Sequence, residues 1–227
     1  MTQSRHFGLV GGLGVGAAVL YYQGITTACA ERNVVPRLTM AHAHAPTALA
    51  HVQAGRIDGL ATFLAGFVGE LDTAGAEFFA IPAITPHICL AELKRQVSLP
   101  IVDILEVTAN RLRGRGLSRM ALFGTKFTID LNLFGALDAF DVVRPRDDEV
   151  EEIHRIYLGL ATMGQITPED EAKMREMAHT LCRRDRVEAI VLAGTDLNLV
   201  FNEANAGFPA VDCLAAHIDA IVAEMLR

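Results

Sequence analysis

The sequence predicts an α/β protein made of two pseudo-symmetric lobes, each a parallel sheet flanked by helices. Short, almost continuous apolar runs alternate with amphipathic stretches of helical period, which is typical of parallel strands covered on both faces. Two pairs of segments also repeat at nearly one offset, which indicates a duplicated unit. The chain has 227 residues, 51% of them hydrophobic, so its core needs no metal or disulfide to be stable.

The predicted strands are apolar runs of the length that buried strands have. Three helix-period segments between them are clear, at residues 17–32, 58–74 and 149–163. The acidic run Asp147-Asp148-Glu149 lies where the last of these helices begins, and the helix dipole favours anions there. Strands are expected at residues 7–10, 38–41, 78–82, 100–104, 120–123, 140–143, 189–193 and 209–212.

The internal repeat defines the expected lobes. Residues 77–85 resemble residues 188–196, and residues 100–105 resemble residues 209–214. These pairs predict an N-terminal lobe of residues 1–100 plus 210–227 and a C-terminal lobe of residues 101–209. Strand carboxyl ends are where such sheets bind ligands, so we expect a cleft between the lobes.

Composition excludes several classes of function. The chain carries 20 Lys and Arg against 27 Asp and Glu, without a basic run, so we expect no nucleic-acid partner. No segment approaches the about 20 apolar residues of a membrane span, and the first residues lack a secretory signal, so a cytoplasmic protein is expected. The four cysteines are far apart, which predicts reduced thiols rather than a zinc site or disulfides.

A glycine-rich turn follows the first strand. Gly12 and Gly14 fit a loose dinucleotide fingerprint, but the acidic residue expected about 20 positions later is missing, which disfavours NAD. Backbone N–H groups at the start of the next helix would suit a substrate carboxylate or phosphate. A tight turn with close helix packing is the alternative interpretation.

Two histidines, His42 and His44, stand at the end of the second strand. Alternation along a strand places both imidazoles on the same side. The pair has only His87 as an obvious third ligand and no acidic partner, so no metal is expected. Hydrogen-bonded pocket histidines are the favoured interpretation.

Polar side chains follow two strands of the predicted sheets. Thr85 and His87 come after residues 78–82, and Thr195 and Asp196 come after residues 189–193. Short hydroxyl and carboxylate side chains at such positions are either helix N-caps or ligand contacts. The repeat favours ligand contacts.

A second candidate loop, Thr125-Lys126-Phe127-Thr128, follows residues 120–123. Its backbone N–H groups, hydroxyls and ammonium would form a binding site for an anionic substrate. A capped helix with a solvated lysine is the alternative.

Four motifs follow one another along the chain. They are Gly-Leu-Val-Gly-Gly-Leu-Gly at 8–14, Ile-Pro-Ala-Ile-Thr-Pro-His at 81–87, Leu-Phe-Gly-Thr-Lys-Phe-Thr at 122–128 and Val-Leu-Ala-Gly-Thr-Asp-Leu at 191–197. Together they resemble the aspartate/glutamate racemase superfamily, the amino-acid racemases that work without pyridoxal phosphate, and the relatives of these enzymes. The resemblance spans essentially the whole chain and implies the two-lobed fold and no cofactor.

The resemblance also implies a catalytic cysteine after one strand of each lobe. In the family one thiolate removes the substrate's α-proton, and the opposite thiol delivers a proton to the other face. Here the two positions are Ala83 and Gly194, whose side chains cannot carry a proton. Relatives with one cysteine, such as the arylmalonate decarboxylase branch, have glycine at the other position. Other family positions remain: Thr85, His87, Thr195 and Asp196, the last in place of the usual Glu.

The cationic groups that hold a dicarboxylate in this family are also missing. The loop at residues 44–49 has no arginine, the segment at 157–161 has no lysine, and Ala18 replaces the usual hydroxyl. A second carboxylate would therefore stay poorly neutralised. Aspartate and glutamate are poor substrate candidates.

Two functions from different classes fit these residues. The first is a diverged enzyme that moves a proton at a small carboxylate or carbonyl substrate through His87 or His44, as an isomerase, lyase or cyclase. The hydroxyl and carboxylate groups at the strand ends would orient substrate or water. The alternative is a catalytically inactive homologue that binds a small molecule or regulates a partner. Family members commonly form homodimers, and residues 17–22 are a candidate interface.

Overall fold

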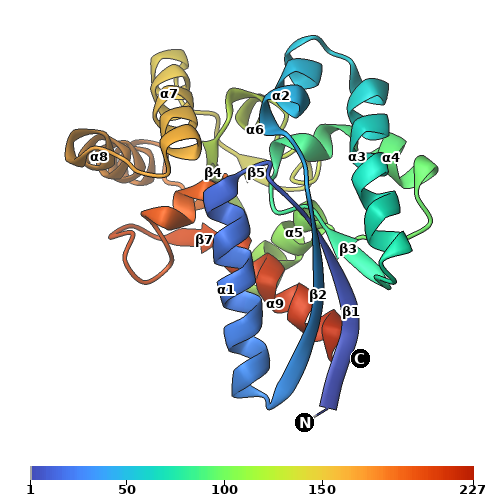
Figure 1. Ribbon diagram of the computed structural model, residues 1–227. Helices are drawn as coiled ribbons and strands as arrows, with labels where there is room; N and C mark the ends of the chain where they lie inside the picture. The colour runs from blue at the N-terminus through green and yellow to red at the C-terminus, as the bar shows by residue number, and fades with distance from the viewer. Residues whose placement is uncertain (1) are drawn as a thin grey trace. The chain divides into compact units, whose positions relative to one another are not determined.

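The computed structural model describes residues 2–227 (Figure 1). The chain divides into two compact units. Unit 1 comprises Met1–Ile104 with His217–Arg227, and unit 2 comprises Leu105–Ala216. The chain crosses from one unit to the other within helices α5 (Ile104–Gly114) and α9 (Cys213–Met225). Each unit contains one parallel sheet flanked by helices, which confirms the predicted fold class.

The sheet of unit 1 has the order β2-β1-β3, with all strands parallel. Its strands are β1 (Thr2–Gly11), β2 (Val34–His42) and β3 (Phe78–Ala80). The central strand β1 buries Phe7 and Leu9 completely, because helices cover the sheet on both faces. The predicted apolar run at 7–10 is therefore the core of unit 1.

Close packing at two glycines sets the helices of unit 1 in place. A Cβ atom at Gly8 would lie 2.9 Å from Leu71 Cδ1 of helix α3, and one at Gly24 of helix α1 would lie 2.7 Å from Ile218 Cδ1 of α9. A methyl group at Gly8 would also crowd Leu71 Cβ, 3.1 Å away, whereas at Gly24 the flexible end of Ile218 would have to move. The helices are α1 (Val15–Glu31), α2 (Ala45–Gln53), α3 (Ile57–Thr73) and α4 (Leu90–Gln96), with the 3-10 helix η1 (Thr85–Cys89).

The sheet of unit 2 has the order β5-β4-β6-β7 and is also parallel throughout. The strands are β4 (Arg119–Gly124), β5 (Asp141–Val142), β6 (Ala189–Ala193) and β7 (Ala210–Asp212). Helices α7 and α8 lie side by side (Figure 1). The helices are α6 (Lys126–Asp130), α7 (Asp147–Met163) and α8 (Pro168–Arg184), with the 3-10 helix η2 (Thr195–Leu199).

The two sheets correspond strand by strand, with one difference at residues 100–104. These residues, predicted as a strand, form only a single parallel bridge from Ile101 to Phe79, where unit 2 has β7. Two backbone hydrogen bonds form this bridge, from the Phe79 N–H to the Pro100 carbonyl and from the Val102 N–H to the Phe79 carbonyl, each 2.9 Å long. The three predicted helices are found as α1, α3 and α7, with ends within two residues of those expected.

None of the helices within residues 2–227 combines the length and the apolar character that crossing a membrane requires.

A buried polar pair joins α1 to α9 inside unit 1. His217 Nε2 lies 2.9 Å from the carbonyl oxygen of Val102, which can only accept, so this nitrogen carries the proton. His217 Nδ1 then accepts the Tyr21 hydroxyl proton across 2.7 Å. Burial lowers the pKa of His217 to about 3, so the ring is neutral in the folded protein.

This pair predicts acid sensitivity. The unfolded chain protonates His217 near its ordinary pKa of 6.5, whereas the folded chain does so only near 3. The free energy of unfolding should therefore fall as the pH drops below 6.5, by about 1.4 kcal/mol per pH unit from this group. Urea unfolding between about pH 7 and pH 5 measures the slope. His217→Gln should flatten it, and the exposed His44→Gln is the control; equal slopes in all three proteins would contradict the prediction.

Candidate functional site

Most of the predicted site residues of unit 1 follow the carboxyl ends of its three parallel strands. Gly11 ends β1 and is paired in register with His42, the last residue of β2. Strand β3 ends at Ala80, and Ala83, Thr85 and His87 follow within a few residues. Carboxyl ends of parallel strands lie on one edge of a sheet, which is where such folds bind ligands.

His87 is a buried neutral imidazole, and one of its two ring nitrogens lacks a hydrogen-bond partner within residues 2–227. Its side chain is 2% exposed, and Nδ1 lies 2.8 Å from the carbonyl oxygen of Ala83. Because a carbonyl only accepts, Nδ1 carries the proton and Nε2 presents a lone pair. Nε2 is buried and has no hydrogen-bond partner within residues 2–227. Burial, opposed by the charge of Asp103, lowers the pKa of His87.

Thr85 and Thr195 begin the short helices η1 and η2 rather than capping them. The N-cap positions are Ile84 and Gly194, and neither helix has a side-chain cap. Of the two interpretations, N-cap or ligand contact, the N-cap does not describe these threonines. Thr195 is fully buried, and Thr85 is partly exposed.

His42 ends β2, His44 is the N-cap of α2, and both are exposed, with Ala43 buried between them. His44 Nδ1 is 2.8 Å from Thr47 Oγ1. No group of three or more His, Cys, Asp or Glu side chains within residues 2–227 is arranged to hold a metal ion.

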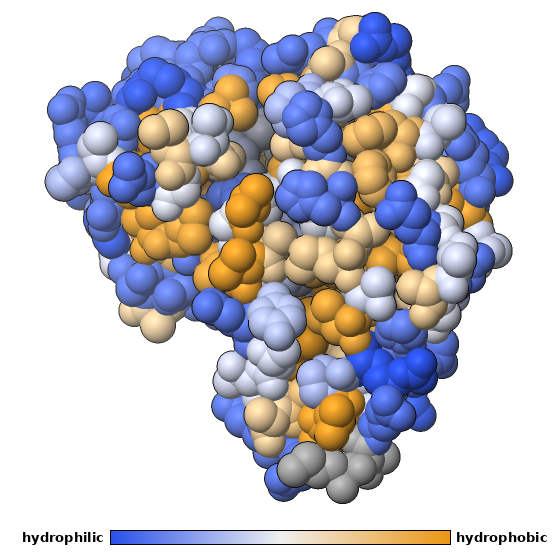
Figure 2. All heavy atoms as spheres, viewed as in Figure 1, coloured by the Kyte–Doolittle hydropathy of each residue, from blue (hydrophilic) through white to orange (hydrophobic). Residues whose placement is uncertain are grey.

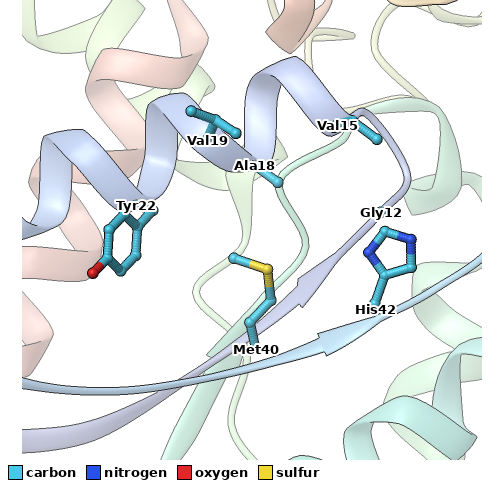
Figure 3. Close-up of a pocket in the computed structure, with 7 residues that line it drawn as sticks. All are labelled: Gly12, Val15, Ala18, Val19, Tyr22, Met40 and His42. Carbon is cyan, nitrogen blue, oxygen red and sulfur yellow. The ribbon is translucent and has the colours of Figure 1, made fainter.

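The glycine turn has a steric explanation. Gly12 adopts a left-handed φ of +84°, and a Cβ there would lie 2.1 Å from the carbonyl oxygen of Ala43, so only glycine fits. Gly14 is the N-cap of α1 and offers no side chain. Beside this turn lies an apolar groove of about 210 Å³ (Figure 3), lined by Gly12, Val15, Ala18, Val19, Tyr22, Met40 and His42.

In unit 2, the polar groups that follow β4 make hydrogen bonds and an ion pair within the protein. Thr125 caps α6 by accepting the Thr128 N–H across 3.2 Å, and the two hydroxyl oxygens are 2.9 Å apart. The Lys126 ammonium pairs with Glu151, which raises the pKa of Lys126. The backbone N–H of Lys126 donates to His154 Nδ1 of helix α7 across 3.2 Å. Thr125 therefore caps α6, as one of the two interpretations predicts, and the binding of an anion by this loop stays a prediction.

Tyr157 of α7 is a site residue that the sequence did not reveal. A Cβ atom at Gly194 would lie 2.3 Å from Tyr157 Cε2, so the ring occupies the space of a side chain at that position. Tyr157 is also hydrogen-bonded to the buried Asp196, and burial followed by the Asp196 charge raises the pKa of the phenol well above 10. Helical period places Tyr157 on the buried face of α7, and the family resemblance places a substrate-holding lysine in the segment 157–161, but neither indicates the contact with Gly194.

The four cysteines within residues 2–227 do not replace the missing thiols. All are free, and burial raises the pKa of each one. The pKa reaches about 12 for Cys89 and Cys213. A thiol with so high a pKa is not a thiolate at neutral pH and cannot act as a base.

Comparisons with known proteins agree with this architecture. A candidate Asp/Glu racemase from Yersinia pestis is 23% identical over 100% of both chains, with a TM-score of 0.84. An aspartate racemase homologue from Pyrococcus horikoshii OT3 is 22% identical over 96% of this chain and 98% of its own, with a TM-score of 0.79. Allantoin racemase from Klebsiella pneumoniae is 13% identical over 97% and 87%, with a TM-score of 0.58.

Identities this low show the fold alone, and the family rests on a separate finding. The family model described as Asp/Glu/hydantoin racemase matches residues 10–221, which is nearly the whole chain. The chain therefore belongs to the Asp/Glu/hydantoin racemase family.

Proposed function

We propose that this protein is a diverged family enzyme that moves a proton at a small carboxylate or carbonyl substrate through one imidazole. The base is His87. The observation that carries this proposal is its Nε2 lone pair, which is fixed in tautomer by the Ala83 carbonyl and is left without a hydrogen-bond partner within residues 2–227. A buried polar atom without a partner costs about 1–3 kcal/mol, a cost typical of functional groups.

One base suits isomerisation, elimination, decarboxylation or cyclisation. Racemisation by two thiols needs a proton carrier for each face of the substrate, and neither Ala83 nor Gly194 supplies one. Thr85, Thr195 and Asp196 orient the substrate or a water molecule in this proposal. The relatives' names, aspartate and allantoin racemase, agree with a small substrate bearing a carbonyl or carboxylate group.

A deuterium-exchange panel tests the base. The protein is incubated in D₂O with malonate, 2-hydroxy acids and amino acids, and uptake of label at carbon is followed by NMR. His87→Gln should lower exchange by about 10²–10⁴-fold, because the positioned base is lost. His44→Gln removes the other candidate imidazole, and His179→Gln of helix α8 is the control. If the exchange rate falls by this factor in His44→Gln and does not fall in His87→Gln, the base is His44 instead.

The same panel separates the enzyme from the alternative function. Because burial lowers the pKa of His87, its base form predominates at neutral pH, and kcat/KM should rise with pH only below about 6.5 and then level off. Binding of panel compounds without turnover, unaffected by His87→Gln, would instead identify a catalytically inactive binding or regulatory homologue.

We also propose that the protein is a cytoplasmic homodimer that uses the apolar face of α1. Val19 and Tyr22 are each 51% exposed, and Val15 is 63% exposed. Figure 2 shows apolar residues gathered along the first half of α1, and Met40 of the edge strand β2 continues this surface. A second copy of the chain would remove this surface from water, which stabilises association.

Sedimentation tests the dimer. Val19→Asp places a charge in the apolar face and should shift the protein from dimer to monomer, because an unpaired charge is costly to bury. Met163→Asp is the matched control, since Met163 is 68% exposed on α7 of unit 2. A wild-type protein that sediments as a monomer would contradict the proposed interface.

A further inference from the structure

A neighbouring side chain, and not the backbone conformation of Gly194, excludes any larger residue at position 194. Its φ of −153° and ψ of 114° are extended values that any residue adopts. The Cβ of any larger residue would nevertheless lie 2.3 Å from Tyr157 Cε2 and 2.6 Å from Tyr157 Cζ. Atoms do not approach so closely, so the aromatic ring and a side chain at position 194 exclude each other.

The Tyr157 hydroxyl is hydrogen-bonded to Asp196, the second residue of η2. Its hydrogen bond with the Asp196 carboxylate raises the phenol pKa, so the phenol is the donor, and the Asp196 backbone N–H donates to the phenol oxygen in turn. Both side chains are buried, with 8% of Tyr157 and 3% of Asp196 exposed. The carboxylate is therefore held by a donor that stays protonated at every pH near neutrality.

Helix α7 reaches a second loop from the same stretch. His154 lies one turn before Tyr157 and accepts the backbone N–H of Lys126 across 3.2 Å. Lys126 and Asp196 lie in the first turns of α6 and η2, which follow β4 and β6, and these strands are paired up to Gly124 and Ala193. One helix thus fixes both loops at the carboxyl edge of the sheet.

We propose that Tyr157 is the positioning residue of the unit 2 site. Its ring replaces a side chain at position 194, and its hydroxyl holds the Asp196 carboxylate in the orientation that the substrate meets. Asp196 contacts the substrate and Tyr157 acts through it, a role that rests on the proposed function. Tyr157 itself is not a base, because its phenol gives up its proton only at high pH.

Substitution at Gly194 tests the steric half of the proposal without any substrate. Gly194→Ala should lower the melting temperature by about 3–10 °C, because the methyl group displaces the ring. Gly159→Ala, on helix α7 itself with nothing within 4 Å of the added Cβ, is the matched control and should keep or raise it. The effect of Gly194→Ala should shrink in a Tyr157→Leu background. A Gly194→Ala protein as stable as wild type overturns the proposal.

Tyrosine titration tests the hydroxyl half, and it is well resolved because the chain has three tyrosines and no tryptophan. Carbon-13 NMR of labelled Cζ atoms should show one signal that Tyr157→Phe removes and that titrates well above the ordinary tyrosine range. Burial and the Asp196 charge together raise the pKa of this phenol, and Asp196→Asn removes the charge, so this signal should titrate at lower pH. An unchanged midpoint in Asp196→Asn overturns the proposal.

Kinetics distinguish positioning from mere packing. Tyr157→Phe keeps the ring and loses the hydroxyl, so it should fold with a melting temperature near that of wild type while kcat in the exchange panel falls about 10–100-fold. A folded Tyr157→Phe protein with wild-type kcat and KM overturns the positioning role. If wild type turns over nothing in the panel, the proposed function fails, and the melting and NMR results still decide whether Tyr157 holds Asp196.

Discussion

Parallel pairing of neighbouring strands is the constraint on which both candidate sites depend. Strand β1 pairs with β3 in unit 1, and β4 pairs with β6 in unit 2, in each case in the same direction. Hydrogen bonding between parallel strands brings their carboxyl ends to one edge, and the chain must turn there into a helix. The polar side chains of those turns therefore lie at the same edge of the sheet, even where they do not contact one another. Packing against helices then decides which of these side chains stay available.

In the two units, packing leaves different groups available. In unit 1 a backbone carbonyl takes the proton-bearing nitrogen of His87 and leaves a lone pair. In unit 2 the phenol of Tyr157 already donates to Asp196, and Lys126 is neutralised by Glu151. The strand orders of the two sheets correspond. The difference between the units therefore arises from their side chains and not from their backbone topology.

The sequence predicts what depends on local pattern and misses what depends on distant contact. The apolar run at 189–193 became β6 with the same bounds. The run at 100–104 forms only one bridge, because hydrophobicity reports burial and not hydrogen bonding. The fold class was therefore predictable from composition, periodicity and repeat.

The candidate sites were predictable only in part. Strand ends identified Thr85, His87, Thr195 and Asp196 as polar residues at the sheet edges, and these positions are where the structure places them. The tautomer of His87 depends on the Ala83 carbonyl, whose direction is set by the turn that begins η1. Tyr157 meets Gly194 from 37 positions away along the chain, a separation that no periodic pattern encodes.

The exclusion between an aromatic ring and a side chain also constrains how this protein can evolve. If the ring at 157 is lost before a side chain appears at position 194, the intermediate carries a cavity beside a buried carboxylate. The opposite order crowds the strand end. Either order passes through a less stable intermediate, so positions 157 and 194 are expected to change together.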